Sequence, residues 1–499
     1  MKRLSSQFLT LCLMTGLLAG CGGESTAGGD TTPADTGTQT TSAETSVYDS
    51  IPDMDLGGMT INIGGYGDST TGESLDTFFT LEETGEVIND AVFRRNRMTE
   101  ERLNCKLNYV LASADNGNYT GSSYRSKIQA NILAGDDTYD IIADKTGGLG
   151  YYLTNGLVRE WDGIEGLNLS NPWYPQNSIE VFTLNNRLYA LGSDALATNL
   201  WMAWCMAFNK RLADEWKTDD LYDVVESGGW TMDYLMNITK NVYRDLNSDG
   251  EKDEDDLYGF YPDKFASLDA MMLSHAGKMT SKNAGDLPVL NGMTERMISS
   301  FESVYRLWWE SEGTFVDATA YDNLPDFAEG RAMIAPMYIS MLFDEQLRSM
   351  EDDYGVLPYP KLDEQQKDYV TYSTGRYGSF YIPVTVTAEK LDVIGYVVET
   401  LGAYSYQLLR PAVYENALAA KGTRDERSVE MIDLILESRD YDFNACMESV
   451  SGFPFTAAAT YRKLIGEQSN TLASFYDANK SAGETYLSDL MKKLEDILQ

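Results

Sequence analysis

The segment Met59-Thr60-Ile61-Asn62-Ile63-Gly64-Gly65 decides the fold class of this chain. Its first five residues alternate between apolar and polar side chains and two glycines follow, which predicts a strand running into a loop. Apolar residues at helical spacing then cover 85–104, and a second strand is predicted over 104–111. A helix over 124–134 and a short buried strand over 139–144 continue the series. Because strands and helices alternate, we expect an α/β fold built on a parallel layer.

The remainder of the chain also mixes predicted strands and helices. The apolar and aromatic run over 201–208 predicts a buried strand, and the apolar stripe from Leu487 to Leu498 predicts a C-terminal helix. Further strands are expected over 187–192, 354–360 and 378–384, and further helices over 231–244 and 294–312.

The composition is strongly acidic. The 499 residues include 77 Asp and Glu but only 39 Lys and Arg, so the formal charge is −38 and the pI is near 4.3. A hydrophobic fraction of 43% is enough to build folded cores, which excludes a disordered acidic protein. Binding to nucleic acid or docking on anionic lipid needs clustered basic residues, and the charge argues against both.

The chain has a single histidine, His275. Zinc sites with three histidines, HExxH hydrolases and two-histidine relays cannot be built from one imidazole, and no GxSxG motif occurs. His275 follows a Met-rich apolar run, which favours packing or hydrogen bonding over ligand contact. We therefore expect a protein that is not an enzyme.

The N-terminus carries the features of a secretory address. Lys2 and Arg3 precede an apolar region that ends in Leu18-Ala19-Gly20-Cys21, which resembles the bacterial lipobox. We expect a signal peptide over 1–20, lipidation of Cys21, and a flexible lipid-anchored tether over 21–50, where small and polar residues dominate. The remaining mature thiols form no CxxC motif, so they are interpreted as small buried hydrophobic side chains. They are Cys105, Cys205 and Cys446.

Short motifs spread along the chain carry a family resemblance. In order, they are Ile61 to Gly67, Ile88-Asn89-Asp90-Ala91-Val92-Phe93-Arg94-Arg95-Asn96-Arg97, Tyr139-Asp140-Ile141-Ile142, Gly156-Leu157-Val158, Leu188-Tyr189-Ala190-Leu191, Phe208-Asn209-Lys210, Gly229-Trp230-Thr231, Phe327-Ala328-Glu329-Gly330-Arg331-Ala332-Met333 and Tyr354-Gly355-Val356-Leu357-Pro358. Their order and spacing resemble those of the extracellular solute-binding lipoproteins of ABC importers, in the family 1 type that takes up sugars. The resemblance covers nearly all of the mature chain.

That resemblance implies a two-lobe periplasmic-binding-protein-like fold with a hinge and an interlobe cleft. Lobe one would comprise 51–200 plus 376–420, and lobe two 201–375 plus 421–499. The protein would be a monomer, held on the extracellular or periplasmic face of the cell membrane by its lipid anchor. Its partners would be a carbohydrate and the ABC permease subunits.

Loops after the predicted strands are the first candidate ligand contacts. In open α/β layers, ligands bind beyond the carboxyl ends of the strands. Tyr66 and Asp68 lie in the loop after the first strand, and Asp144 and Lys145 in the loop after the strand over 139–144. These loops match cleft-facing loops of the family. The alternative is that their glycines only turn the chain.

Aromatic residues are the second group of candidates, because sugars stack on aromatic rings while polar groups bond their hydroxyls. Trp201 and Trp204 should lie on opposite faces of a crossover strand, because their separation is odd. Core packing remains the alternative for each aromatic residue; Trp230, Trp308 and Trp309 are assigned to packing, and Trp173 and Tyr174 are left open. The other candidates from the family's pattern are Phe265, Tyr338, Arg376 and Tyr377.

The segment 245–256 resembles an EF-hand loop. Oxygen-bearing side chains stand at its positions 1, 3, 5, 9 and 12, with Gly250 at position 6. The twelfth residue is Asp rather than Glu, as in the dockerin type. A structural Ca²⁺ ion is expected; the alternative is a solvated acidic loop. The predicted ligands are Asp245, Asn247, Asp249, Glu251 through its carbonyl group, Asp253 and Asp256.

The leading functional hypothesis is capture of a mono- or oligosaccharide for delivery to a permease. Ligand would favour the closed form, and the permease would recognise that form. Two alternatives stay open: a glycoside hydrolase that uses two carboxylates, and a surface adhesin. The abundance of acidic residues guarantees candidate carboxylate pairs, so it does not favour the enzyme.

Overall fold

The computed structural model describes residues 51, 53–66, 78–113, 122–275, 277–317, 323–373, 376–418, 426–450 and 452–498. The predicted signal peptide, Cys21, the tether and Asp68 lie outside the described residues. None of the described helices is long and apolar enough to span a membrane.

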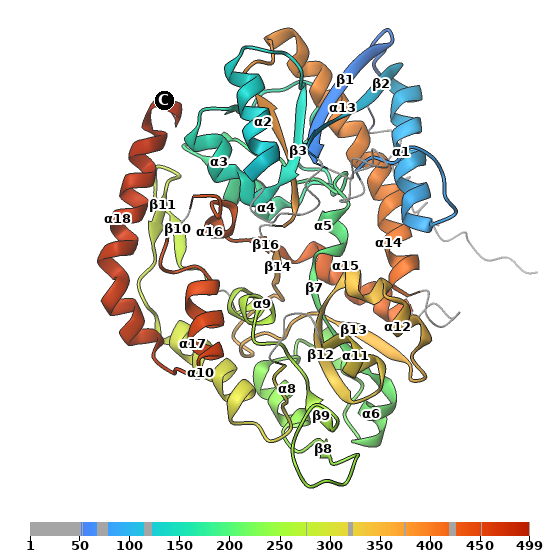
Figure 1. Ribbon diagram of the computed structural model, residues 1–499, viewed down its shortest axis with the longest axis vertical. Coiled ribbons are helices and arrows are strands. Elements are labelled where there is room, and N and C mark those ends of the chain that lie inside the picture. Colours follow the sequence, from blue (N-terminus) through green and yellow to red (C-terminus); the bar gives the residue numbers. More distant parts are fainter. Residues whose placement is uncertain are drawn as a thin grey trace, which may run out of the picture. The chain divides into compact units, whose positions relative to one another are not determined.

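The first five-stranded sheet has the order β2-β1-β3-β15-β4. Figure 1 labels its strands β1, β2 and β3. β1 (Met59–Tyr66) pairs in parallel with β2 (Cys105–Ser113) and with β3 (Ile141–Lys145). β15 (Gly378–Pro383) then pairs antiparallel with β3 and with β4 (Val158–Arg159). The predicted parallel layer is thus confirmed for the N-terminal strands, and a strand from much later in the chain extends it.

Gly64 and Gly65 lie inside β1, so the predicted end of this strand at Ile63 is wrong. A Cβ atom on Gly64 would lie 2.4 Å from the Tyr139 ring, and one on Gly65 would lie 2.3 Å from the Tyr109 hydroxyl oxygen. The two glycines therefore serve close packing against these rings rather than a turn.

The second five-stranded sheet has the order β13-β7-β12-β9-β8 (Figure 1). β7 (Trp204–Asn209) pairs antiparallel with β12 (Ala332–Tyr338) and with β13 (Tyr354–Leu357). β9 (Leu257–Phe260) pairs in parallel with β12 and antiparallel with β8 (Tyr243–Arg244). Every residue of β7, β12, β13 and β9 is buried, as expected for strands covered on both faces.

The chain passes from the elements of the first sheet to those of the second where α5 (Thr198–Trp201) leads into β7. It returns where β14 (Thr371–Ser373) leads into β15, and β14 pairs in parallel with β16 (Arg439–Tyr441). The predicted lobe boundaries remain a prediction.

Three predicted elements differ from the structure. Trp201 ends α5, and the ladder of β7 begins only at Trp204, so the two residues do not share one strand. In place of a strand over 187–192, Arg187–Leu188 forms a short hairpin strand, and Leu191 makes an isolated bridge to Phe380. The helix predicted over 231–244 ends at Thr239, because Tyr243 and Arg244 pair with β9 instead.

The predicted helices over 85–104, 124–134 and 294–312 and the C-terminal helix are confirmed, as α1, α2, α10 and α18. Leu487, Leu490 and Leu494 are buried on α18, in agreement with its apolar stripe. The three described cysteines are buried and free, as interpreted.

The other helices of the described chain have the following bounds: α1 (Val87–Leu103), α2 (Ser122–Leu133), α3 (Leu149–Thr154), α4 (Gln176–Phe182), α6 (Lys210–Glu215), α7 (Leu221–Glu226), α8 (Met232–Thr239), α9 (Ala266–Ser274), α10 (Glu295–Trp309), α11 (Asn323–Ala328), α12 (Glu345–Ser349), α13 (Ala388–Tyr404), α14 (Arg410–Ala417), α15 (Glu426–Glu437), α16 (Phe443–Cys446), α17 (Lys463–Gly466) and α18 (Leu472–Leu498). The remaining short strands are β5 (Thr183–Leu184), β6 (Arg187–Leu188), β10 (Thr280–Lys282) and β11 (Pro288–Leu290).

Candidate functional site

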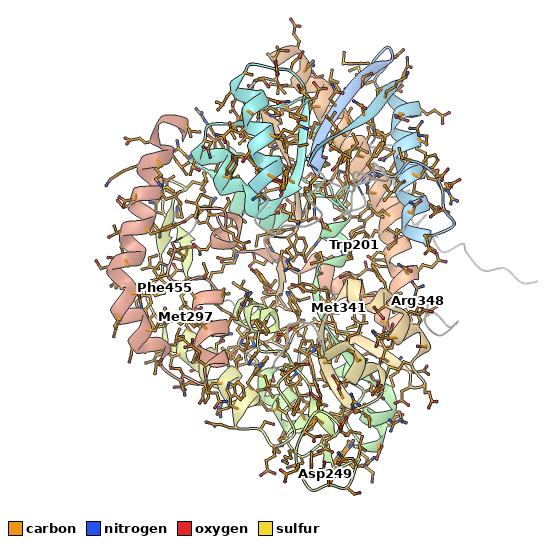
Figure 2. The ribbon with its side chains drawn as sticks, in the orientation of Figure 1. Trp201, Asp249, Met297, Met341, Arg348 and Phe455 are labelled. Carbon is orange, nitrogen blue, oxygen red and sulfur yellow. The ribbon has the colours of Figure 1, made fainter. Side chains whose placement is uncertain are left out.

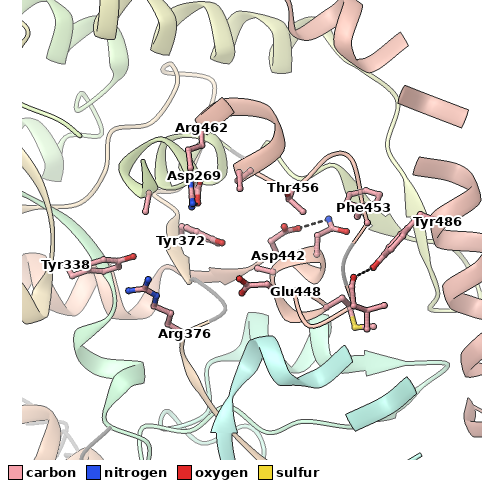
Figure 3. Close-up of a pocket in the computed structure, with 18 residues that line it drawn as sticks. Asp269, Tyr338, Tyr372, Arg376, Asp442, Glu448, Phe453, Thr456, Arg462 and Tyr486 are labelled. Carbon is pink, nitrogen blue, oxygen red and sulfur yellow. Dashed lines mark hydrogen bonds and ion pairs between the residues drawn. The ribbon is translucent and has the colours of Figure 1, made fainter. Parts of the chain in front are cut away.

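A cavity of about 490 Å³ is the candidate binding site (Figure 3). Its walls come from the start of α9, the end of β12, the residues around β14, and the chain from β16 to α18. In the view of Figure 3, Tyr338 and Arg376 lie at one end and Phe453 and Tyr486 at the other, with Asp269, Tyr372 and Asp442 between them. The lining residues are Ala266, Asp269, Tyr338, Tyr372, Arg376, Asp442, Asn444, Ala445, Met447, Glu448, Val450, Gly452, Phe453, Thr456, Ala457, Ala458, Arg462 and Tyr486.

Most of this lining comes from one stretch, residues 442–462, which we call the C-terminal wall. Near its start, the Ser449 amide donates to the Gly147 carbonyl oxygen (3.3 Å), and Ser449 Oγ accepts from the Tyr151 amide (2.8 Å). Near its end, Arg462 pairs with the Asp269 carboxylate on α9. The wall is thus held by residues next to β3 at one end and by α9 at the other.

Two lining carboxylates have perturbed acidity. Burial raises the pKa of Asp269 to about 6, although the Arg462 guanidinium lowers it in part. Burial likewise raises the pKa of Asp442 to about 6, and the Lys278 ammonium opposes this. The Asp442 carboxylate accepts from Asn444 Nδ2 at 3.2 Å. The cavity therefore presents acceptor groups that are costly to keep charged without a partner.

Aromatic rings and arginines complete the lining. Tyr338 packs on Trp204, with ring centroids 4.0 Å apart, and Tyr486 donates its hydroxyl to the Val450 carbonyl oxygen at 2.6 Å. Tyr372 and Phe453 add two further rings. Apolar faces beside carboxylates and guanidinium groups suit a ligand that has both apolar faces and hydroxyl groups.

Two of the ligand-binding candidates line this cavity, namely Tyr338 and Arg376. Phe265 caps α9 directly before the lining residue Ala266. Trp204 is buried, with its ring against that of Tyr338. Trp201, labelled in Figure 2, packs against Phe343.

The candidates from the first sheet lie elsewhere. Asp144 is buried in an ion pair with Arg125 (2.7 Å) and also accepts from the hydroxyls of Tyr124 and Tyr152. Tyr66 and Asp144 line a separate cavity of only about 10 Å³, and the Lys145 ammonium lies 5.0 Å from the Tyr66 ring centroid. The contacts of Asp144 with Arg125, Tyr124 and Tyr152 are those of a side chain that holds the fold together.

Tyr377 is also buried, with its ring 5.7 Å from that of Tyr441. Burial holds the pKa of the Tyr377 phenol above its ordinary value. Tyr377 is not among the residues that line the large cavity.

Sequence reasoning missed Asp269, Tyr372, Asp442, Phe453 and Tyr486. For Asp442 a signal existed, because it directly follows the carboxyl end of β16, where ligands bind in open sheets. For the others no local pattern marks a ligand contact, since they meet only in the folded chain.

The aromatic residues assigned to packing behave as expected. Trp230 and Trp308 are buried and donate their indole N–H groups to the carbonyl oxygens of Pro358 (2.8 Å) and Asp263 (3.0 Å). Trp309 is half-buried, with its N–H on the Ile465 carbonyl oxygen. Trp173 and Tyr174, for which the sequence favours neither role, are buried as well.

His275 is buried, and its Nδ1 lies 2.9 Å from Ser300 Oγ, which confirms the packing and hydrogen-bonding interpretation. Burial lowers the pKa of His275 to about 3, and the nearby Arg296 adds to this effect.

The acidic loop over 245–256 makes internal hydrogen bonds; Figure 2 labels its Asp249. The Asp245 carboxylate accepts from the amides of Ser248 (2.6 Å) and Gly250 (3.0 Å), and Gly250 has a φ of +82°. The buried Asp256 carboxylate accepts from the Leu246 amide and the Tyr243 hydroxyl. Among the described residues, no group of three or more His, Cys, Asp or Glu side chains is placed to hold a metal ion. The donor types fit calcium, but the carboxylates are not gathered around one point.

Comparison with solved structures identifies the fold. The cyclic α-maltosyl-1,6-maltose binding protein from Arthrobacter globiformis matches with a TM-score of 0.56 and 11% identity, over 87% of this chain and 100% of that one. A family 1 extracellular solute-binding protein from Bifidobacterium longum subsp. infantis matches with a TM-score of 0.54 and 14% identity, over 85% and 100% of the two chains. A cyclo/maltodextrin-binding protein complexed with maltotetraose matches with a TM-score of 0.53 and 12% identity, over 88% and 97%. No protein-family model and no curated protein sequence matches the chain.

Proposed function

Because the chain has the two-lobe α/β fold of the extracellular solute-binding proteins, as predicted, we propose that it captures a carbohydrate for an ABC importer. It would hold the sugar in the cavity of Figure 3 and deliver it to the membrane permease. The work is then differential affinity: ligand stabilises one arrangement of the protein, and the permease recognises that arrangement.

The lining of the cavity is the observation that carries this proposal. It places the rings of Tyr338, Tyr372, Phe453 and Tyr486 around buried carboxylates and guanidinium groups. A pyranose ring has apolar faces that pack on aromatic rings and polar edges that bond to charged groups. A volume of about 490 Å³ lies within the usual range of small-molecule sites.

A thermal-shift screen against mono- and oligosaccharides tests the proposal. A sugar present at about 100 times its Kd should stabilise the protein by about 2.7 kcal/mol. Tyr372→Ala should abolish the shift, whereas the control Tyr305→Ala, on α10 outside the cavity, should retain it. The proposal fails if no carbohydrate shifts the melting temperature, which is the result that an adhesin without a small ligand would give.

The structural neighbours named above are binding proteins rather than enzymes. We therefore propose that capture involves no covalent chemistry. Incubation with the bound oligosaccharide should return it intact; release of shorter sugars would support the glycoside hydrolase alternative instead.

Attachment to the membrane is part of the same proposal. After removal of residues 1–20, a lipid on Cys21 would anchor the monomer at the cell surface, and the chain over 21–50 would tether it. Mass spectrometry of the mature N-terminus tests this directly. Cys21→Ser should release the protein from the membrane fraction, and continued membrane attachment of this variant would contradict the anchor.

We also propose that the loop over 245–256 binds a structural Ca²⁺ ion when calcium is present. The support is its set of oxygen donors and the αL conformation of Gly250 at the sixth position. Asp245, Asn247, Asp249, Asp253 and Asp256, with the Glu251 carbonyl group, would hold the ion. Calcium at millimolar concentration should raise the melting temperature of the wild type but not of Asp245→Asn; an equal rise in both would reject the site.

A further inference from the structure

The charges around the cavity do not balance. Of the described residues that line it, Asp269, Asp442 and Glu448 are acids, whereas Arg376 and Arg462 are the basic residues. The Asp269 carboxylate is matched by Arg462 through their ion pair. Among the described lining residues, acidic side chains therefore outnumber basic ones by one.

Asp442 is the centre of this imbalance. Its side chain is only 4% exposed, and within the described part of the chain it forms no ion pair. Lys278, whose charge acts on Asp442, instead contacts the Asp440 carboxylate, with Nζ 2.6 Å from Oδ1. The hydrogen bonds to the Asp442 carboxylate come from the side chain and the backbone of Asn444, which are neutral partners for a charged group.

We propose that the ligand of this cavity is a carbohydrate that bears a cationic amino group, and that Asp442 pairs with that group. This inference rests on the proposed function, since it names the class of sugar that the same cavity takes. A neutral sugar hydroxyl would bond to Asp442 but leave its charge uncompensated, whereas an ammonium group removes that cost.

Three further observations agree with a cationic ligand. Burial raises the pKa of Asp442 above its ordinary value even though the Lys278 ammonium lowers it in part, as expected for a buried carboxylate that is not directly paired with a cation. The rings of Tyr372, Phe453 and Tyr486 line the same cavity and can hold an ammonium group by cation–π contact as well as a sugar face. The formal charge of −38 would also speed the approach of a cation.

The test compares sugars that differ only at the amino position. Isothermal titration at pH 7.5 would use glucosamine, galactosamine and mannosamine, and the β-1,4 disaccharide of glucosamine, each beside its N-acetyl and hydroxyl counterparts. A charge-assisted hydrogen bond contributes about 1.5–3 kcal/mol, so the amine should bind roughly 10- to 100-fold tighter than its neutral counterparts. Asp442→Asn should remove this preference.

Asp489→Asn is the matched control. It removes the same charge from an exposed position on α18 outside the cavity, and it should leave the preference for the amine unchanged. The inference is overturned if no amine-bearing sugar binds, if neutral counterparts bind as tightly, or if Asp442→Asn keeps the preference. Tight binding of neutral sugars alone would leave the proposed function standing, whereas the absence of binding by any carbohydrate would reject both.

Discussion

The buried carboxylate of Asp442 should destabilise the ligand-free protein at neutral pH. Its pKa rises from the ordinary 3.8 to about 6 because of burial, which corresponds to a cost of about 3 kcal/mol once the group is ionised in the folded state. Between pH 4 and 6 the folded state binds more protons than the unfolded state at this site. The stability contributed by this site is therefore greatest below pH 4 and is lost as the pH rises through 6.

Asp442→Asn removes the ionisable group while it keeps the shape of the side chain. The variant should be more stable than the wild type at pH 7.5 by up to about 3 kcal/mol, and this gain should vanish at pH 4. For a chain of this length the entropy of unfolding is roughly 1 kcal/mol/K, so the melting temperature should rise by about 3 °C. Thermal and urea unfolding of both proteins from pH 4 to pH 8 would measure the difference.

The difference at pH 4 serves as the internal reference, because both side chains are neutral there and only the amide substitution remains. Asp489→Asn, at an exposed position on α18, is the control for the loss of one carboxylate. The quantity to compare is the free energy of unfolding of Asp442→Asn minus that of the wild type. The reasoning is refuted if this difference is the same at pH 4 and pH 7.5, or if it is smaller at pH 7.5 than at pH 4.

Three further variants test other parts of the structure. Asp144→Asn leaves the Arg125 guanidinium buried without its carboxylate and should cost about 3–5 kcal/mol in urea unfolding; a loss below 1 kcal/mol would contradict the ion pair. His275→Gln should reduce the loss of stability that occurs as the pH falls from 6.5 to 4. Burial lowers the pKa of His275 to about 3, so in this pH range the proton binds the unfolded state and favours unfolding. An unchanged pH profile of the free energy of unfolding would count against this. Gly64→Ala places a Cβ atom 2.4 Å from the Tyr139 ring and should lower the free energy of unfolding by about 1–3 kcal/mol. Gly250→Ala meets no atom within 4 Å but has a φ of +82°, and it should lower this free energy by less. The reverse order would argue against the packing of β1.

Much of the fold could be predicted because its signals are local. The alternation in 59–63 and the helical spacing in α1 and α18 arise from which side chains face the core, and that periodicity is visible in the sequence. Pairings between distant segments cannot be read in this way. Trp201 and Trp204 lie in one apolar run, but the pairing of this segment with β12 begins only at Trp204.

The candidate site was less predictable. Tyr338 and Arg376 were found through the resemblance. Asp144 was expected in a loop after a strand, but it lies within β3, where its carboxylate is bound by Arg125, Tyr124 and Tyr152. A carboxylate near the end of a strand can face a ligand or a buried arginine, and the arginine that decides this for Asp144 lies on another element, α2.

The sequence by itself determined the acidic character, the α/β class and the absence of the common histidine-based mechanisms, because these depend on composition and local periodicity alone. Only the tertiary structure decided where a ligand would bind. The C-terminal wall over 442–462 is distant in sequence from Asp269, Tyr338 and Arg376, and chain folding alone brings these groups around one cavity. The electrostatics of this cavity therefore depend less on the formal charge of −38 than on the single buried carboxylate of Asp442. Which groups surround that carboxylate is decided by residues distant in the sequence.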